Sequence, residues 1–160
     1  MNGAVNHGLL SFRLECIPPK TSHHAKRIVR IGGFSRLADK PELVEAKHSL
    51  EALLLPFQPA QPIPGPVSLF VSYTWPWVDS RHGKAGSLRR QRVQAAGRQP
   101  HTTKPDLTNV TKTLEDRLVL LRFLENDQSV AELHVSKYWG NRPGIGITIR
   151  TSVAEPADGR

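Results

Sequence analysis

Cysteine is almost absent from this sequence of 160 residues, in which Cys16 stands alone. A single cysteine excludes an internal disulfide framework and any zinc module built on several cysteines, and it is typical of a reducing compartment. Long apolar runs are also missing, because stretches such as 53–55 stop far short of the ~18 residues of a membrane-spanning helix. The N-terminus has no basic start followed by an apolar block, so the sequence predicts no secretion signal. We therefore expect a cytoplasmic protein without a membrane segment.

Acidic residues are scarce relative to basic ones. Lys and Arg number 22 against 14 Asp and Glu, so the formal net charge is +8. The segment 80–104 contains no acid and carries most of this charge, on Arg81, Lys84, Arg89, Arg90, Arg92, Arg98 and Lys104. Since it also has few large apolar residues, we expect a mobile loop with a short helix over 88–96. Its charge favours contact with phosphates; a solvated insertion that serves solubility is the alternative interpretation.

The rest of the chain has the periodicity of short strands and two longer helices. Alternation of apolar and polar residues predicts strands over 9–16, 27–31, 67–73, 129–138 and 145–149. Apolar residues at helical spacing predict helices over 41–55 and 105–122, the first with Asp39 as N-cap and Pro56 as its stop. These elements predict an α+β fold in which a small mixed or antiparallel sheet packs with two main helices.

The length favours a single compact domain. We expect it to cover residues 9–150, with the basic loop 80–104 inside it. The remaining residues, 1–8 and 151–160, are expected to be a flexible N-terminus and a flexible C-terminal tail.

Acidic residues around the second predicted helix form a candidate metal site. Asp106 precedes the helix, Asp116 lies on its polar face, and Asp127 and Glu132 follow in the next turn and strand. If that strand runs back along the helix, these carboxylates would converge on Mg²⁺, which prefers oxygen ligands. Such an ion beside a basic surface suits phosphodiester hydrolysis, and Lys112 would stabilise the transition-state charge.

Each of these residues also has an ordinary structural interpretation. Asp106 can be a helix N-cap, and Lys112 with Asp116 can be a surface ion pair at i, i+4 spacing. Asp127 can be a turn residue. Spacing alone therefore leaves the metal site and these structural roles open.

Four stretches of the sequence resemble those of a known protein family. They are HTTKPDLTNVTK (101–112), Glu115-Asp116, ENDQ (125–128) and ELHVSK (132–137). In this order they resemble the RusA family of phage-type Holliday junction resolvases, whose pattern is KPDxDN, a later Lys and Asp, an acidic turn and a strand ending in Lys. The resemblance covers about residues 9–150. It implies a RusA-like fold and a Mg²⁺-dependent endonuclease, with Mn²⁺ as an alternative ion.

The resemblance further implies a homodimer that cuts four-way DNA junctions in recombination and repair. It also implies a location in the cytoplasm of a bacterium or phage-infected cell, associated with the nucleoid. By the same resemblance, Asp106 and Asp127 are catalytic metal ligands and Lys112 is the essential lysine. Thr108 stands where the family usually has its second Asp, and Asn126 where the turn often has its first Asp. The Thr108 hydroxyl is a weaker and neutral ligand, so Asp116, Glu132 or an extra water is expected to compensate for the missing Asp.

DNA contacts are expected from the basic segment and from the strand that ends in Lys137. The residues concerned are Arg81, Lys84, Arg89, Arg90, Arg92, Arg98, Lys104 and Lys137. Phosphate contacts of this kind position DNA without reading its sequence.

Three functions remain open at this stage. A structure-selective endonuclease, which we favour, predicts metal-dependent nicking. A non-catalytic protein that binds branched or single-stranded DNA predicts binding without metal, with Trp75, Trp77 and Trp139 stacking on bases. A basic protein-interaction domain predicts neither. For the three tryptophans we favour packing in the core and in a dimer interface over base stacking.

Overall fold

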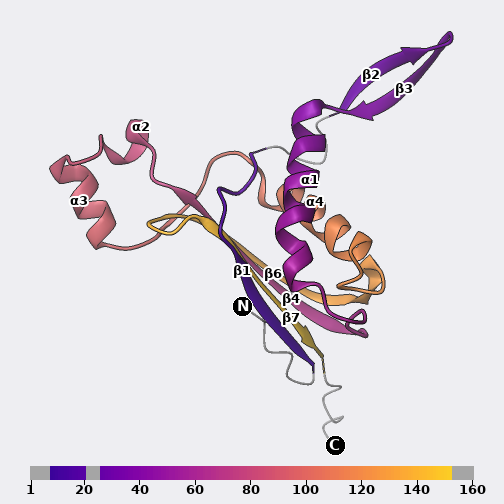
Figure 1. The fold of residues 1–160 in the computed structure, drawn as a ribbon. Coiled ribbons are helices and arrows are strands. Elements are labelled where there is room, and N and C mark those ends of the chain that lie inside the picture. Colours follow the sequence, from indigo (N-terminus) through magenta and orange to yellow (C-terminus); the bar gives the residue numbers. More distant parts are fainter. Residues whose placement is uncertain (1–7, 21–25, 153–160) are drawn as a thin grey trace, which may run out of the picture.

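The computed structural model describes residues 8–20 and 26–152. It contains a five-stranded sheet in the order β1-β7-β4-β6-β5 and a separate two-stranded sheet, β2-β3. The strands are β1 (Leu9–Leu14), β2 (Lys26–Ile31), β3 (Phe34–Asp39), β4 (Val67–Pro76), β5 (Gln99–Pro100), β6 (Val130–Gly140) and β7 (Gly144–Thr151). The helices are α1 (Pro41–Leu54), α2 (Asp79–His82), α3 (Leu88–Ala95) and α4 (Leu107–Leu120), with 3₁₀ turns η1 (Leu55–Phe57) and η2 (Asp127–Ser129). The expected α+β class with a mixed sheet is confirmed (Figure 1).

Helices α1 and α4 cover one face of the sheet (Figure 1). Only β4 and β6 pair in parallel, and the other neighbours are antiparallel. Alternation along β4 sends Leu69, Val71 and Tyr73 into the core, where they join the apolar stripe of α4. The intervening residues of β4 face the other side, which neither long helix covers. The sheet is therefore half covered, as the alternating sequence pattern predicts for most strands.

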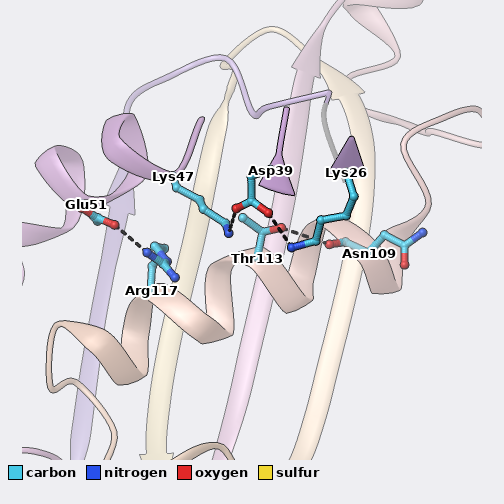
Figure 2. Close-up of polar contacts among 7 residues, drawn as sticks. All are labelled: Lys26, Asp39, Lys47, Glu51, Asn109, Thr113 and Arg117. Carbon is cyan, nitrogen blue, oxygen red and sulfur yellow. Dashed lines mark hydrogen bonds and ion pairs between the residues drawn. The ribbon is translucent and has the colours of Figure 1, made fainter. Parts of the chain in front are cut away.

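The strand expected over 27–31 is one half of a hairpin whose second strand, β3, was not predicted. Gly32 and Gly33, with φ of 57° and 82°, form the two-residue turn, which only a left-handed backbone allows. Asp39 ends β3 and is not the N-cap of α1. Lys40 takes that position without a side-chain cap, and the Asp39 carboxylate instead accepts from Lys26 and Lys47 (Figure 2).

The basic segment contains two helices and a short strand, whereas its composition predicted a mobile loop with one short helix. Helix α3 lies within the predicted 88–96, and α2 and β5 flank it. The segment is held to the sheet by stacked aromatic rings. His101 stacks on Trp139 with 3.8 Å between ring centroids, and His82 lies edge-on between Trp77 and Trp139. Composition could not reveal this, because two of these rings come from outside the segment.

The last strand of the sheet ends one residue past the expected limit of 150. Strand β7 runs to Thr151, whose backbone N–H donates to the carbonyl of Gly8 at 2.7 Å. The expected flexible ends 1–8 and 151–160 fall otherwise outside the described residues. Among the helices of the described ranges, none is both long and apolar enough to span a bilayer.

Candidate active site

Asp106 lies at the N-terminus of α4, and its carboxylate does not cap the helix as the local sequence would predict. It occupies the N-cap position, and its carbonyl accepts the first helical hydrogen bond, from Val110. Its side chain makes no capping hydrogen bond and is exposed. An N-cap Asp normally accepts from a backbone N–H of the first turn. The carboxylate of Asp106 is therefore available to an external ligand.

Lys137 holds the turn that leads into Asp106. Its ammonium group donates to the carbonyls of Thr103, at 2.5 Å, and Pro105, at 2.7 Å. Burial lowers the pKa of Lys137, and the nearby charge of Asp106 opposes that shift. Lys137, which the sequence predicts to bind DNA, thus makes hydrogen bonds within the protein. Its half-buried ammonium binds strand β6 to the turn and sets the start of α4.

Lys112 brings the middle of α4 and the turn η2 together. Its Nζ lies 3.3 Å from Oδ1 of Asp116 and 3.4 Å from Oδ2 of Asp127. Burial lowers the pKa of Lys112, but hydrogen bonds to both carboxylates outweigh this, so the pKa is raised. The ammonium is therefore charged at neutral pH. The predicted i, i+4 pair does form, and a carboxylate from a separate element joins it.

Glu115 belongs to the same cluster, although the sequence did not single it out as a ligand. It is half-buried, and burial raises its pKa, with the charges of Asp116 and Asp127 adding to the effect and Lys112 opposing it. The hydroxyl of Tyr73, buried beneath α4, has no hydrogen-bond partner among the described residues. The sequence signal that could have identified Glu115 was its place beside Asp116 on the polar side of a strongly amphipathic helix.

Glu132 does not reach this cluster. Its carboxylate accepts from Ser68 Oγ at 2.5 Å and lies 3.9 Å from His134 Nε2. Residues 132 and 137 differ by an odd number along β6, so their side chains leave opposite faces of the sheet. Lys137 points toward α4 and Glu132 toward the uncovered face. Glu132 was expected as a possible ligand beside Asp106. That expectation is wrong, because the alternation along β6 places its side chain on the other face of the sheet.

The two positions at which the sequence departs from the family pattern have different surroundings. Thr108 is exposed in the first turn of α4. Asn126 is the N-cap residue of η2, and its Oδ1 accepts from the hydroxyl of Ser129 at 3.2 Å. Thr108 thus stands open to solvent near Asp106, whereas Asn126 has a local structural role.

Six of the seven cations in the basic segment are exposed. These are Arg81, Lys84, Arg89, Arg92, Arg98 and Lys104. Arg90 is the exception, because its side chain is 9% exposed and its Nη2 lies 2.7 Å from Oδ1 of Asp79. That ion pair joins α3 to α2. Arg90, expected to contact DNA, is therefore a structural residue of the segment.

The carboxylates present fit a hydrated divalent cation. Within residues 8–20 and 26–152, no three His, Cys, Asp or Glu side chains converge closely enough to enclose an ion. Mg²⁺ does not require such a cage, since it commonly binds one or two carboxylates and keeps several waters. The uncapped carboxylate of Asp106 and the exposed carboxylate of Asp127 are hard oxygen donors of the right kind. The donor set thus fits Mg²⁺ better than a softer metal.

The three tryptophans are packing residues. Trp75 is almost completely buried, and Trp77 and Trp139 are each 9% exposed. Trp75 donates its indole N–H to the carbonyl of Pro18, and Trp77 donates to Asn141 Oδ1. The prediction of core packing is confirmed, and stacking on DNA bases would require these rings to leave the core.

Comparison with known proteins agrees with this geometry. The family model described as "Endodeoxyribonuclease RusA" matches residues 17–150. Over 108 residues the chain is 32% identical to a Bacillus subtilis (strain 168) protein, "Uncharacterized protein YqaN", a stretch that covers 68% of this chain and 67% of that protein. The α+β fold and the family match thus place the chain in a class of nucleases that act on DNA. The chain belongs to the RusA endodeoxyribonuclease family.

Proposed function

We propose that this protein is a Mg²⁺-dependent endonuclease that cuts four-way DNA junctions by phosphodiester hydrolysis. The observation that carries the proposal is the uncapped carboxylate of Asp106 on the same helix as the Lys112–Asp116–Asp127 cluster. It stands in a chain whose family match runs across the whole site. Asp106 and Asp127 would hold the ion, with Asp116 as the neighbouring carboxylate. When bound, Mg²⁺ neutralises a phosphate oxygen and lowers the pKa of a coordinated water.

The residues of the chain have separate tasks in this proposal. Lys112 is kept charged by its two carboxylate partners and stabilises negative charge that develops on the phosphate. Lys137 positions Asp106 by holding the turn before it. The pKa of Glu115 is raised, which suits it to take up a proton within the cluster as the pH falls. The exposed cations of α2 and α3 hold the phosphate backbone.

We further propose that the active form is a homodimer working in the cytoplasm on recombination or repair junctions. Paired cuts on opposed strands require two sites related by a two-fold axis. The uncovered sheet face suits the contact between subunits. It contains a shallow groove of about 580 Å³ in which Phe70 stacks on His134 with 4.5 Å between ring centroids.

A non-catalytic junction-binding protein is the second candidate. Thr108, a neutral residue, stands at the second Asp position of the family pattern, which favours a site with less charge for a metal. Incubation of the purified protein with a labelled synthetic four-way junction, with and without Mg²⁺, separates the two. Cleavage that requires Mg²⁺ supports the nuclease. Binding without cleavage at any Mg²⁺ or Mn²⁺ concentration supports the second candidate.

A further inference from the structure

The β2–β3 hairpin exposes an unusual amount of apolar surface. It projects from the rest of the molecule beyond the N-terminal end of α1 (Figure 1). Four large apolar side chains on it are exposed, namely Ile28 (71%), Ile31 (60%), Phe34 (81%) and Leu37 (69%). By register, Ile28 and Leu37 pair on one face of the ribbon, and Ile31 and Phe34 pair on the other. An isolated two-stranded ribbon is marginally stable, and exposed apolar pairs on both of its faces favour an interaction site. The hairpin therefore has the composition of a contact surface.

The base of the hairpin is firmly attached. The carboxylate of Asp39 accepts from Lys26 of β2 and Lys47 of α1 (Figure 2). These two hydrogen bonds hold the pKa of Asp39 at about 2, so the contact persists over the whole physiological range. Helix α1 is in turn tied to α4 by Arg117 Nη1 and Glu51 Oε1, 2.7 Å apart. The hairpin is thus mounted on the helical layer that carries the candidate active site.

The charge of the hairpin indicates the chemistry of its partner. It carries Lys26, Arg27, Arg30 and Arg36, and its sole acid, Asp39, is already paired twice. None of the three arginines forms an ion pair with another side chain in the described part of the chain. By strand register, arginines alternate with apolar residues on both faces of the ribbon. Unpaired cations of this density favour a polyanion over an apolar protein surface.

The tip of the hairpin is narrow and apolar. Ile31 and Phe34 are paired across the Gly32-Gly33 turn, and a Cβ built on either glycine meets nothing within 4 Å. Six residues per strand give a reach of about 20 Å from the base. A two-stranded ribbon fits the major groove, apolar wedges insert between base steps, and aromatic rings stack on unpaired bases. The tip has the size and chemistry for such a wedge.

We propose that the β2–β3 hairpin is a second DNA-contacting element, with Phe34 placed against unstacked bases at the branch point. The arginines of the hairpin contact the phosphates of an adjoining duplex arm. In Figure 1 the α2–α3 segment and the hairpin extend in different directions from the body, so the two elements would hold different parts of a branched substrate. The inference rests on the proposed function, because a branch point offers unstacked bases next to duplex arms.

The test uses the full-length protein and a four-way junction carrying 2-aminopurine at the crossover, with a linear duplex of the same sequence for comparison. Phe34→Ala should weaken junction binding about tenfold, the scale of one lost base–aromatic stack, and abolish the 2-aminopurine fluorescence change. Its duplex affinity should stay within about twofold of native. The triple variant Arg27→Gln, Arg30→Gln and Arg36→Gln should weaken both complexes and reduce the salt slope by about three.

Matched controls are Leu55→Ala, which removes another exposed apolar side chain, and Arg122→Gln, which removes an exposed cation beyond the C-terminal end of α4. Both should bind like the native protein, and circular dichroism should show every variant folded. Junction affinity and fluorescence unchanged in Phe34→Ala would overturn this inference alone, provided that the native protein binds and cuts junctions. Native protein that binds no branched DNA would overturn both proposals. Loss of the native oligomeric state in Phe34→Ala, with an unchanged fluorescence signal, would assign the hairpin to a second copy of the chain and overturn the DNA contact.

Discussion

At the scale of single residues, the decisive information is what each carboxylate does and does not contact. Asp39 and Asp106 both precede a helix, and both were reasonable N-caps from sequence. The carboxylate of Asp39 accepts hydrogen bonds from two lysines, whereas that of Asp106 makes no capping hydrogen bond. Local sequence cannot separate these outcomes, because they depend on whether a cation from another element comes within reach.

Substitution of the proposed metal ligands tests this assignment. Asp106→Asn or Asp127→Asn should reduce junction cleavage about 100-fold or more, while binding stays equal or tightens because negative charge near the phosphates is removed. Lys112→Ala should lower cleavage about 10²- to 10³-fold through lost stabilisation of the transition state. Single-turnover cleavage and electrophoretic mobility shift assays report the two properties separately. Glu132→Gln is the matched control, since its carboxylate lies on the other sheet face, and a loss equal to that of Asp106→Asn would contradict the site described here.

Thr108 allows a gain of function to be tested. If the site lacks charge, Thr108→Asp should raise cleavage at limiting Mg²⁺, because a second carboxylate binds the ion more tightly. A Mg²⁺ titration of native protein and variant should then show a lower half-saturating concentration for the variant. If Asp116 or Glu115 already supplies the charge, the added Asp should lower cleavage, and Asp116→Asn should be as damaging as Asp127→Asn.

At the scale of elements, the basic segment separates into exposed cations and a buried anchor. Arg89 and Arg92 lie exposed on α3, and Arg90 on the same helix is buried against Asp79. Three arginines in four residues look equivalent in sequence. Helical geometry separates them, since residues one or two positions apart point to different sides of a helix.

Two variants of α3 should therefore behave differently. Arg89→Gln with Arg92→Gln should weaken junction binding and reduce the salt slope by about two, with little change in stability. Arg90→Gln should lower the free energy of unfolding by about 1 kcal/mol, because the buried guanidinium loses a hydrogen bond to Asp79, whose own side chain is exposed to water, and leave the slope unchanged. Salt-dependent binding and chemical denaturation measure the two effects. A salt slope that falls only in Arg90→Gln would reverse the assignment.

The aromatic anchor of the same segment predicts a pH dependence. Burial is the main cause that lowers the pKa of His82 and of His101, with nearby cations contributing. Both rings therefore stay neutral to lower pH in the folded protein than in the unfolded chain, which takes up protons near pH 6.5. Stability should be complete above that value and fall as the pH decreases through it.

Thermal unfolding between pH 7.5 and 5.5 checks this expectation. The double variant His82→Phe and His101→Phe keeps two rings that cannot titrate, so its melting temperature should depend less on pH over this range. An equal pH dependence in native protein and variant would show that other groups are responsible.

At the scale of the whole molecule, one face of the sheet is covered by α1 and α4 and the other face is left to solvent. The uncovered face carries Phe70 stacked on His134, with the guanidinium of Arg150 at 5.3 Å from the Phe70 ring centroid. In the proposed dimer, a two-fold axis would place this patch against its own copy. The tryptophans, once candidates for that interface, are occupied in the core of the subunit.

Sedimentation tests this arrangement. The native protein, 17.8 kDa per chain, should sediment as a dimer at micromolar concentration. Phe70→Glu should shift it toward the monomer, because it places a charge in the contact. Ser80→Glu, an exposed position outside that face, is the control and should remain dimeric. A native protein found only as a monomer, with and without junction DNA, would contradict the dimer.

Much of the fold follows from the sequence by itself. The apolar stripe of 105–122 predicts α4, and alternation along 67–73 and 129–138 predicts β4 and β6, because these periodicities report which side of an element is buried. The residues from Asp106 to Asp127 were assigned through the resemblance to a family motif, whose members are close together along the chain. Only the tertiary structure decided that Lys112 joins Asp116 to Asp127, that Glu132 faces away, and that Arg90 is buried. Those outcomes depend on strand register and on contacts between distant segments, which local patterns do not encode.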